Sequence, residues 1–379
     1  MTRRVMLFAA VALLAITAHL LATSGTVVKP KVVAPGGDAI AAYANRLVVG
    51  PPHRCENLSL FLVTVPGAKI PGVDMTLDQA VSKGLVEVTE LGSSQVNTLT
   101  VRNRGKEPVF AMGGEMLRGG KQDRIIADDL LLPARATLDV AVYCVEHGRW
   151  ALGERGGGAG GRGGFTTGHS LAGADVRQAG GGGGRGGGQG AVWESVASQQ
   201  RSLKAPSTTG ALRSVHDSKM VRDQISPYLR AFSDLAEDNP KACGVVAVVG
   251  DEILAADLFT SPVIFRQMWP DLLESYAIDA VERTVSDHPD LHLLHKHHRP
   301  DTAFVIRWLN GLRSAERVWR KTPGEGALYD VHSRDFTGSA LVWQDGVVHL
   351  GLLPTAMQAH PEPTTRLLTP DQRRQRSGR

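Results

Sequence analysis

The sequence predicts an α+β fold, with mixed or antiparallel sheets and segregated helices in one body. Short β-rich segments follow one another between residues 57 and 146. Capped helical segments dominate the region after residue 192, where two further hairpin patterns also occur. Runs of strands set apart from runs of helices are typical of this class. A long glycine-rich insertion interrupts the body.

The first half begins with a β-rich run over Asn57–Val65. Thr76 and Gln79 form a capping box that opens a short helix, and Gly84 ends it as a left-handed cap residue. The remaining segments read as strands bounded by turns. They are Leu85–Glu90, Thr98–Arg102, Pro108–Met112, Arg124–Leu132 and Leu138–Glu146.

The second half is richer in helices. Residues 192–202 have a helical pattern. Ser226-Pro227 is expected to open a helix that runs to about Leu235. Ser261-Pro262 is expected to open another helix, which runs through Pro270 to about Val281. Two hairpins are predicted around the turns Gly250-Asp251 and Asp345-Gly346, the latter of type I′. They join the strands Gly244–Val249 with Ile253–Leu258, and Ser339–Trp343 with Val347–Leu353.

The insertion at residues 155–189 consists of glycine runs punctuated by arginine. Glycine loses the most entropy on ordering, so this stretch is predicted to be disordered, and its deletion to leave the core intact. Its Arg-Gly-Gly steps resemble RNA-binding tails, but export would remove most RNA partners. The interpretation adopted is a flexible loop between two pieces of one domain.

The N-terminus is the clearest targeting signal. Arg3 and Arg4 form a basic region, residues 5–22 carry no formal charge, and Ala22-Thr23-Ser24 offers small residues at a cleavage position. We therefore expect residues 1–24 to be a cleaved signal peptide or a retained membrane anchor. The protein would then be periplasmic, extracellular or membrane-anchored.

A linker is expected over residues 25–50, the domain over 51–354 and a basic disordered tail over 355–379. The net charge is +4, but the excess arginine lies in residues 1–24, in the insertion and in the tail. The remaining body is slightly acidic, which argues against a nucleic-acid partner. Membrane contact is expected only through an uncleaved N-terminus.

Polar residues concentrate in residues 113–150. Glu115 lies between an apolar strand and a Gly-Gly turn, and Gln122, Asp123 and Arg124 follow that turn. Two carboxylates, Glu115 and Glu146, could divide acid and base roles if their environments separated their pKa values. Arg149 and Trp150 complete the candidate site. Arg124 and Arg149 would clamp a small anion, and Trp150 would stack on a ligand.

The same residues suit a structural role, because carboxylate–arginine pairs at strand ends often fix turns. Cys55, Cys144 and Cys243 have no metal-binding spacing, and at most one disulfide could join two of them. Cys144 lies on an apolar strand, which favours an inert thiol. No nucleophile elbow, phosphate loop or zinc-protease motif is present, and no cofactor is indicated.

These segments resemble a known family, the ARG and rhodanese-phosphatase-superfamily-associated protein domain. The matching pieces include Gly114-Glu115-Met116-Leu117, residues 120–124 and residues 144–150, and further matches reach Asp257-Leu258-Phe259 and Trp269-Pro270. The family's usual asparagine is Asp123 here. The resemblance implies a nucleotide-derived or ADP-ribose-like ligand, and it names no reaction.

A histidine-rich run provides weak metal-ligand candidates. On a helix, His288, His292 and His295 would share one face. Pro289 and Pro300 favour an irregular connector instead.

Two functions remain open from the sequence. One is an enzyme acting on a small molecule through Glu115 and Glu146. The other is a non-catalytic ligand-binding or scaffolding domain of the cell envelope that uses the same pocket.

Overall fold

The computed structural model describes residues 37–91, 96–148, 164–181, 187–286 and 299–355. These residues belong to one compact unit. The signal or anchor segment, the basic tail beyond residue 355 and the histidine-rich run lie outside them. Within the described chain, no helix is long and apolar enough to cross a bilayer.

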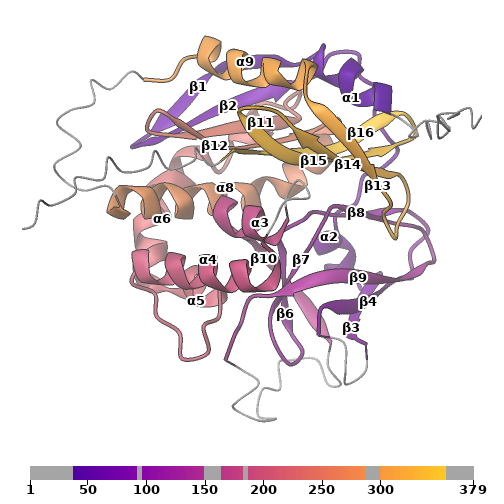
Figure 1. Ribbon diagram of the computed structural model, residues 1–379, viewed down its shortest axis with the longest axis vertical. Helices are drawn as coiled ribbons and strands as arrows, with labels where there is room; N and C mark the ends of the chain where they lie inside the picture. The colour runs from indigo at the N-terminus through magenta and orange to yellow at the C-terminus, as the bar shows by residue number, and fades with distance from the viewer. Residues whose placement is uncertain (1–36, 92–95, 149–163, 182–186, 287–298, 356–379) are drawn as a thin grey trace, which may run out of the picture. The chain divides into compact units, whose positions relative to one another are not determined.

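The larger sheet has eight antiparallel strands in the order β1-β2-β11-β12-β16-β15-β14-β13 (Figure 1). Both predicted hairpins lie in it, and strands from both ends of the chain meet there. The strands are β1 (Val48–Cys55), β2 (Leu58–Thr64), β11 (Gly244–Val249), β12 (Glu252–Phe259), β13 (Glu316–Arg320), β14 (Ala327–His332), β15 (Phe336–Trp343) and β16 (Gly346–Pro354).

Helices cover both faces of this sheet (Figure 1). On β2, Leu60 and Leu62 pack against α6 (Lys219–Phe232) and α8 (Pro262–Ser286). Phe61 and Val63 point to the other face, towards α1 (Gly37–Ala44) and α9 (Thr302–Leu309). Alternate side chains of a strand point to opposite faces, so a strand covered on both sides is apolar throughout.

The second sheet has six strands in the order β10-β6-β7-β9-β4-β3. A bridge between Thr89 and Gly164 brings its two edges together. The strands are β3 (Val86–Glu90), β4 (Thr98–Asn103), β6 (Glu115–Gly119), β7 (Arg124–Ile126), β9 (Thr137–Cys144) and β10 (Phe165–Leu171).

One apolar side of this curled sheet packs on the helix α2 (Leu77–Ser82) and a two-stranded ribbon of β5 (Val109–Ala111) and β8 (Leu130–Leu132). Its other side packs on α3 (Ala174–Gly180) and α4 (Gly188–Ser202). Three short helices complete the described chain. These are α5 (Arg213–Asp217), α7 (Leu235–Asp238) and the 3₁₀-helix η2 (Asn310–Arg313).

Antiparallel sheets with separate helical layers confirm the predicted α+β class. The predicted N-cap and C-cap of the first helix are also confirmed, since the Thr76 hydroxyl accepts a hydrogen bond from the Gln79 N–H and Gly84 has a φ of 67°. The reciprocal half of the capping box was wrong, because the Thr76 N–H donates to the side chain of Gln267 and not to that of Gln79. The second hairpin turns one residue earlier than predicted. Its positive φ values fall at Gln344 (49°) and Asp345 (59°).

The prediction of a disordered insertion over residues 155–189 was wrong for residues 164–181 and 187–189. They form β10, α3 and the start of α4, and β10 pairs with β6. Phe165 is buried in the second sheet, and Val176 packs against α4. The sparse apolar residues among the glycines suffice because each is buried in one of the cores that surround these elements, Phe165 with the second sheet, Leu171 with α8 and Val176 with α4. Residues 155–163 and 182–186 lie outside the described chain.

Two boundaries also differ from the prediction. Residues 37–50 were expected to be a linker, but they form α1 and the start of β1. Ile40 and Tyr43 of α1 pack on the larger sheet, and this burial stabilises the helix. Ser226-Pro227 does not open a helix. Instead α6 begins after Ser218, whose hydroxyl caps the Val221 N–H, and continues through Pro227. Packing of its buried stripe against α8 offsets the hydrogen bond that proline cannot make.

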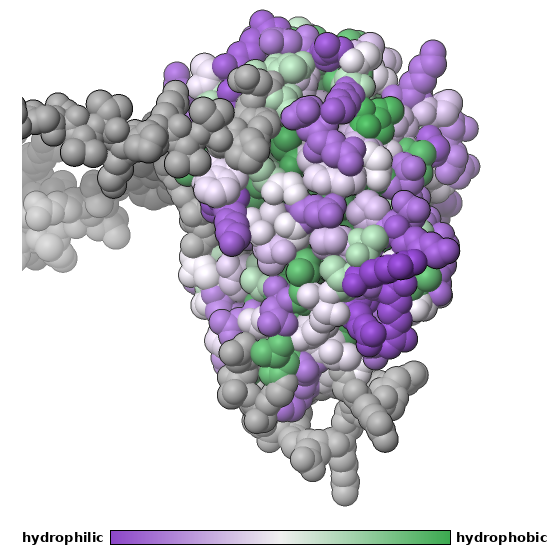
Figure 2. All heavy atoms as spheres, turned by 90° about the vertical axis from the view of Figure 1, so that its right-hand side faces the viewer, coloured by the Kyte–Doolittle hydropathy of each residue, from purple (hydrophilic) through white to green (hydrophobic). Residues whose placement is uncertain are grey.

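On the face shown in Figure 2, polar and apolar residues are interspersed, and no broad apolar patch covers the described part. A large hydrophobic interface is therefore not indicated on this face.

The packing of β10 predicts that Phe165→Ala destabilises the protein. The side chain is 6% exposed, and loss of a buried phenyl ring costs about 3–5 kcal/mol of unfolding free energy. Chemical denaturation of this variant should be compared with that of Thr166→Ala, the exposed neighbour on β10. Equal losses in the two variants would contradict the packing role of residues 164–181.

Candidate functional site

Four of the residues predicted from the sequence meet where β6, β7 and β9 come together. The Gln122 amide donates to the Glu146 carbonyl at 2.8 Å, and the Asp123 N–H donates to Glu146 Oε2 at 3.3 Å. The Arg124 guanidinium donates to the Gln122 side chain and to the Asp123 carbonyl, each at 3.3 Å. All four residues are buried, and burial lowers the pKa of Arg124.

A segment much later in the chain completes this network. The Thr209 hydroxyl donates to Glu146 Oε1 at 2.8 Å, while Arg213 Nε lies 3.3 Å from Asp123 Oδ2. Sequence reasoning missed Thr209 and Arg213, since neither carries a local motif. The contacts connect β7 and β9 with the start of α5, so they stabilise the fold there.

Glu115 lies in a different environment. Its Oε2 accepts a hydrogen bond from the Met112 N–H at 2.8 Å, which closes the turn between β5 and β6. Burial, together with the nearby carboxylates Asp271 and Asp78, raises the pKa of Glu115 well above its usual value. The roles predicted for Glu115, Gln122, Asp123, Arg124 and Glu146 stay predictions.

The remaining candidates cannot be placed. Arg149 and Trp150, as well as His288, His292 and His295, lie outside the described residues. In the parts of the chain that the structure does cover, no group of three or more side chains could hold a metal ion. Cys55, Cys144 and Cys243 are all free thiols. Burial raises the pKa of Cys144, which lowers its reactivity.

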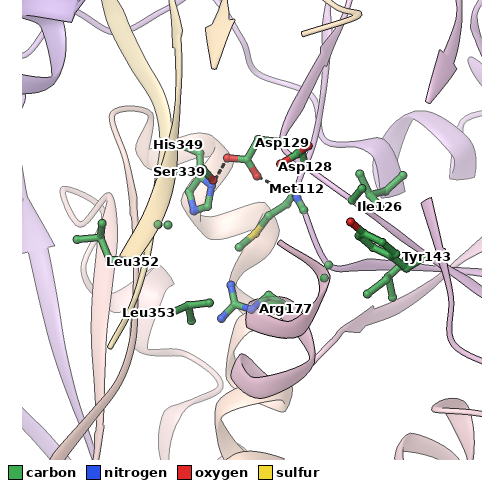
Figure 3. A pocket seen from close by; sticks show the side chains of 17 residues that line it. Met112, Ile126, Asp128, Asp129, Tyr143, Arg177, Ser339, His349, Leu352 and Leu353 are labelled. Carbon is green, nitrogen blue, oxygen red and sulfur yellow. Dashed lines mark hydrogen bonds and ion pairs between the residues drawn. The ribbon is translucent and has the colours of Figure 1, made fainter. Parts of the chain in front are cut away.

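A small cavity between the two sheets collects polar side chains that sequence reasoning did not group (Figure 3). Its volume is about 40 Å³. The turn after β5, the loop between β7 and β8, α3, β15 and β16 form its walls. Glu115 and Glu146 are not among its lining residues, which include Met112, Asp128, Asp129, Tyr143, Arg177, Ser339, His349 and Gly351.

His349 lies between two buried carboxylates. Its Nδ1 is 2.7 Å from Asp129 Oδ2, and its Nε2 is 3.4 Å from Asp257 Oδ1. The ring also stacks on Phe259, with centroids 4.5 Å apart. Burial alone would lower the pKa of His349, but the two aspartates outweigh it and raise the pKa to about 9. The imidazole is therefore a cation at neutral pH.

Arg177 pairs with Asp257 from the opposite side. Its two terminal nitrogens donate to the two carboxylate oxygens at 2.9 and 3.3 Å, and the Tyr276 hydroxyl donates to the same carboxylate. Burial opposes ionisation of Asp257, but Arg177, and after it His349, hold the pKa of Asp257 below its usual range. One chain of alternating charge thus runs from Asp129 through His349 and Asp257 to Arg177.

Glycine and a helix cap place Arg177 in the cavity. Gly114 has a φ of 96°, and a Cβ on it would lie 2.7 Å from Arg177 Cγ, so this turn requires glycine. Asp279 of α8 accepts from the Ala174 N–H at 2.8 Å and holds the first turn of α3. Burial raises the pKa of Asp279 to about 7.

Two buried donors in the cavity lack a hydrogen-bond acceptor within the described chain. They are Arg177 Nε and His349 Nε2, whose contact with Asp257 is an ion pair without hydrogen-bond geometry. Arg177 is 9% exposed and His349 2% exposed. Unsatisfied buried donors are rare and costly, so an acceptor group in the cavity would stabilise Arg177 Nε and could add a hydrogen bond to His349 Nε2.

The sequence profile of the ARG and rhodanese-phosphatase-superfamily-associated protein domain matches residues 46–353. The chain belongs to this family. No curated protein and no solved structure matches the chain. The family domain spans β1 to β15 entirely and all but the last residue of β16, and so includes both sheets, the cavity and the Glu146 network.

The raised pKa of His349 predicts a loss of stability of the family domain at alkaline pH. Protonated His349 contributes stability that is complete below about pH 6.5, its unfolded pKa, and is lost as the pH rises through about 9. The unfolding free energy should fall by about 3 kcal/mol over this interval. Denaturation series for the wild type and His349→Gln, with an NMR titration of the imidazole, would test this. If the imidazole of His349 in the folded protein titrates near pH 6.5, the prediction is wrong.

Two charge-removing substitutions should differ in their effect on stability. Glu146→Gln should cost about 1–3 kcal/mol, because Glu146 serves the Asp123 N–H, Thr209 and Arg213 together. Glu115→Gln should cost less, because the side-chain oxygen of glutamine can still accept the hydrogen bond from the Met112 N–H and no ion pair is lost. Thermal and denaturant unfolding measure both. A ligand role for Glu115 or Glu146 would be shown by a loss of ligand binding in a variant that remains folded.

Proposed function

We propose that this domain binds a small molecule through an oxyanion, a carboxylate or a phosphate, held by Arg177 and His349 in the cavity between the two sheets. The supporting observation is a pair of buried cationic side chains that line one cavity. Arg177 Nε has no hydrogen-bond acceptor within the described chain, and His349 Nε2 has only its 3.4 Å ion pair with Asp257. Charge-assisted hydrogen bonds from such groups are among the strongest available to a protein.

The size of the cavity limits the ligand. A volume of about 40 Å³ corresponds to about three water molecules, which suffices for one anionic group with a small substituent. A nucleotide or ADP-ribose would not fit inside, although one of its terminal groups could enter. The anion clamp predicted from the sequence is thus proposed at Arg177, not at Arg124 or Arg149.

Binding is favoured over catalysis by the state of the charged groups. His349 is protonated at neutral pH and ion-paired on both sides, so it lacks the free lone pair of a general base. The proposed role is that of an exported or membrane-anchored ligand-binding domain, the location expected from residues 1–24.

Gly351→Ala should abolish oxyanion binding. Gly351 lines the cavity, and an added Cβ would lie 3.1 Å from His349 Cε1 and 3.6 Å from Asp257 Oδ1, where it occupies the cavity without changing any charge. Isothermal titration with acetate and with inorganic phosphate measures the effect. Mass spectrometry of the purified protein would identify any ligand that is retained.

Gly72→Ala is the matched control, because a Cβ at Gly72 has nothing within 4 Å. It should bind as the wild type does. If neither acetate nor phosphate binds the wild type, or if Gly351→Ala binds them equally well, the proposed function is wrong.

A further inference from the structure

Charged side chains of both signs line the cavity (Figure 3). Arg177 enters from α3 and His349 from β16, whereas Asp128 and Asp129 lie on the loop between β7 and β8. The site is therefore not a simple anion hole, since two carboxylates line it beside the two cations.

Both carboxylates keep capacity for another donor. Asp128 accepts from Arg320 at 2.8 and 3.1 Å, one bond on each oxygen. Asp129 accepts from the Gly113 N–H at 2.9 Å and from His349 at 2.7 Å, again one bond on each oxygen. An ionised carboxylate has about four lone-pair sites, so each aspartate could accept about two more hydrogen bonds.

Hydroxyl groups lie beside these carboxylates. The Tyr143 hydroxyl is close enough to Asp128 for that charge to raise the pKa of Tyr143, after the larger effect of burial. Ser339 lines the cavity from β15. Carboxylate and hydroxyl oxygens together form the acceptor set that an ammonium group prefers.

Charge balance favours a ligand of zero net charge. Arg177 and protonated His349 offset Asp128 and Asp129 within the lining. Behind the lining, Asp257 pairs with Arg177 and Arg320 pairs with Asp128, which adds one charge of each sign and leaves the balance unchanged. A simple anion would add an uncompensated charge to this partly enclosed site, which costs desolvation free energy. A zwitterion avoids that cost, because it supplies a carboxylate to the cations and an ammonium to the aspartates.

The other walls restrict the size of such a ligand. Met112, Ile126, Leu352 and Leu353 provide apolar surface. Space for about three water molecules is comparable to the volume of glycine or alanine, so a long side chain would have to leave the cavity.

We propose that the cavity binds a small zwitterionic amino acid, with its carboxylate on Arg177 and His349 and its ammonium group on Asp128 and Asp129. This inference rests on the proposed function, since it requires the same oxyanion site. It adds the class of ligand, a zwitterion, and it assigns the ammonium group of that ligand to Asp128 and Asp129.

The test is isothermal titration of the full chain with glycine and L-alanine, and with the half-ligands acetate and methylammonium. Each amino acid should bind about tenfold or more tightly than acetate, and methylammonium should bind weakest. The Asp128→Asn variant should weaken the binding of glycine and L-alanine about tenfold or more and leave the binding of acetate unchanged or stronger.

Asp330→Asn is the matched control, because Asp330 pairs with the same Arg320 at 2.6 Å but does not line the cavity. It should bind the amino acids as the wild type does. If acetate binds at least as tightly as the amino acids, or if Asp128→Asn binds them unchanged, the zwitterion proposal is wrong and the oxyanion site stands. If acetate, inorganic phosphate and the amino acids all fail to bind, the oxyanion site itself is refuted.

Discussion

The buried chain of charges from Asp129 through His349 and Asp257 to Arg177 connects the parts of this domain. Asp129 belongs to the loop before β8, His349 and Asp257 to the larger sheet, and Arg177 to α3. Desolvation of four ionised groups is costly, and each is compensated only by its neighbours. Loss of one would leave an unpaired charge in the interior, so all of these elements must assemble together.

Helix α8 extends this dependence. It packs on the larger sheet and sends Tyr276 to Asp257, Asp279 to the start of α3 and Ser275 to the Ala172 carbonyl. The same helix therefore orients the carboxylate that binds Arg177 and the backbone that carries it. Few degrees of freedom remain for the guanidinium, and this preorganisation lowers the entropic cost of binding a ligand there.

The domain has two buried polar centres with different character. Around Glu146, donors and acceptors satisfy one another across β7, β9 and the start of α5, as expected of a network that specifies a fold. Around His349, Arg177 Nε has no acceptor within the described chain, His349 Nε2 has only its ion pair with Asp257, and glycine keeps the space beside them open. The open cavity beside Arg177 and His349, more than the number of charges, distinguishes the proposed ligand site from the structural network.

The sequence by itself determined the fold class and most element positions, because strand and helix periodicities and turn residues act over short range. It also determined the family, because the segments that carry the resemblance are short runs of consecutive residues. It also led to the prediction that Gln122, Asp123, Arg124 and Glu146 lie in one site, and these residues do flank adjacent strands. Asp257 and His349 carried a local signal as well, because each is a polar residue within an apolar strand and so requires a buried partner. Only the tertiary structure decided that the partners are Arg177 and Asp129, which lie 80 and 220 residues away in the chain. Arg177 was hidden in a glycine-rich stretch whose few apolar residues become informative only once α4 and the second sheet are there to bury them.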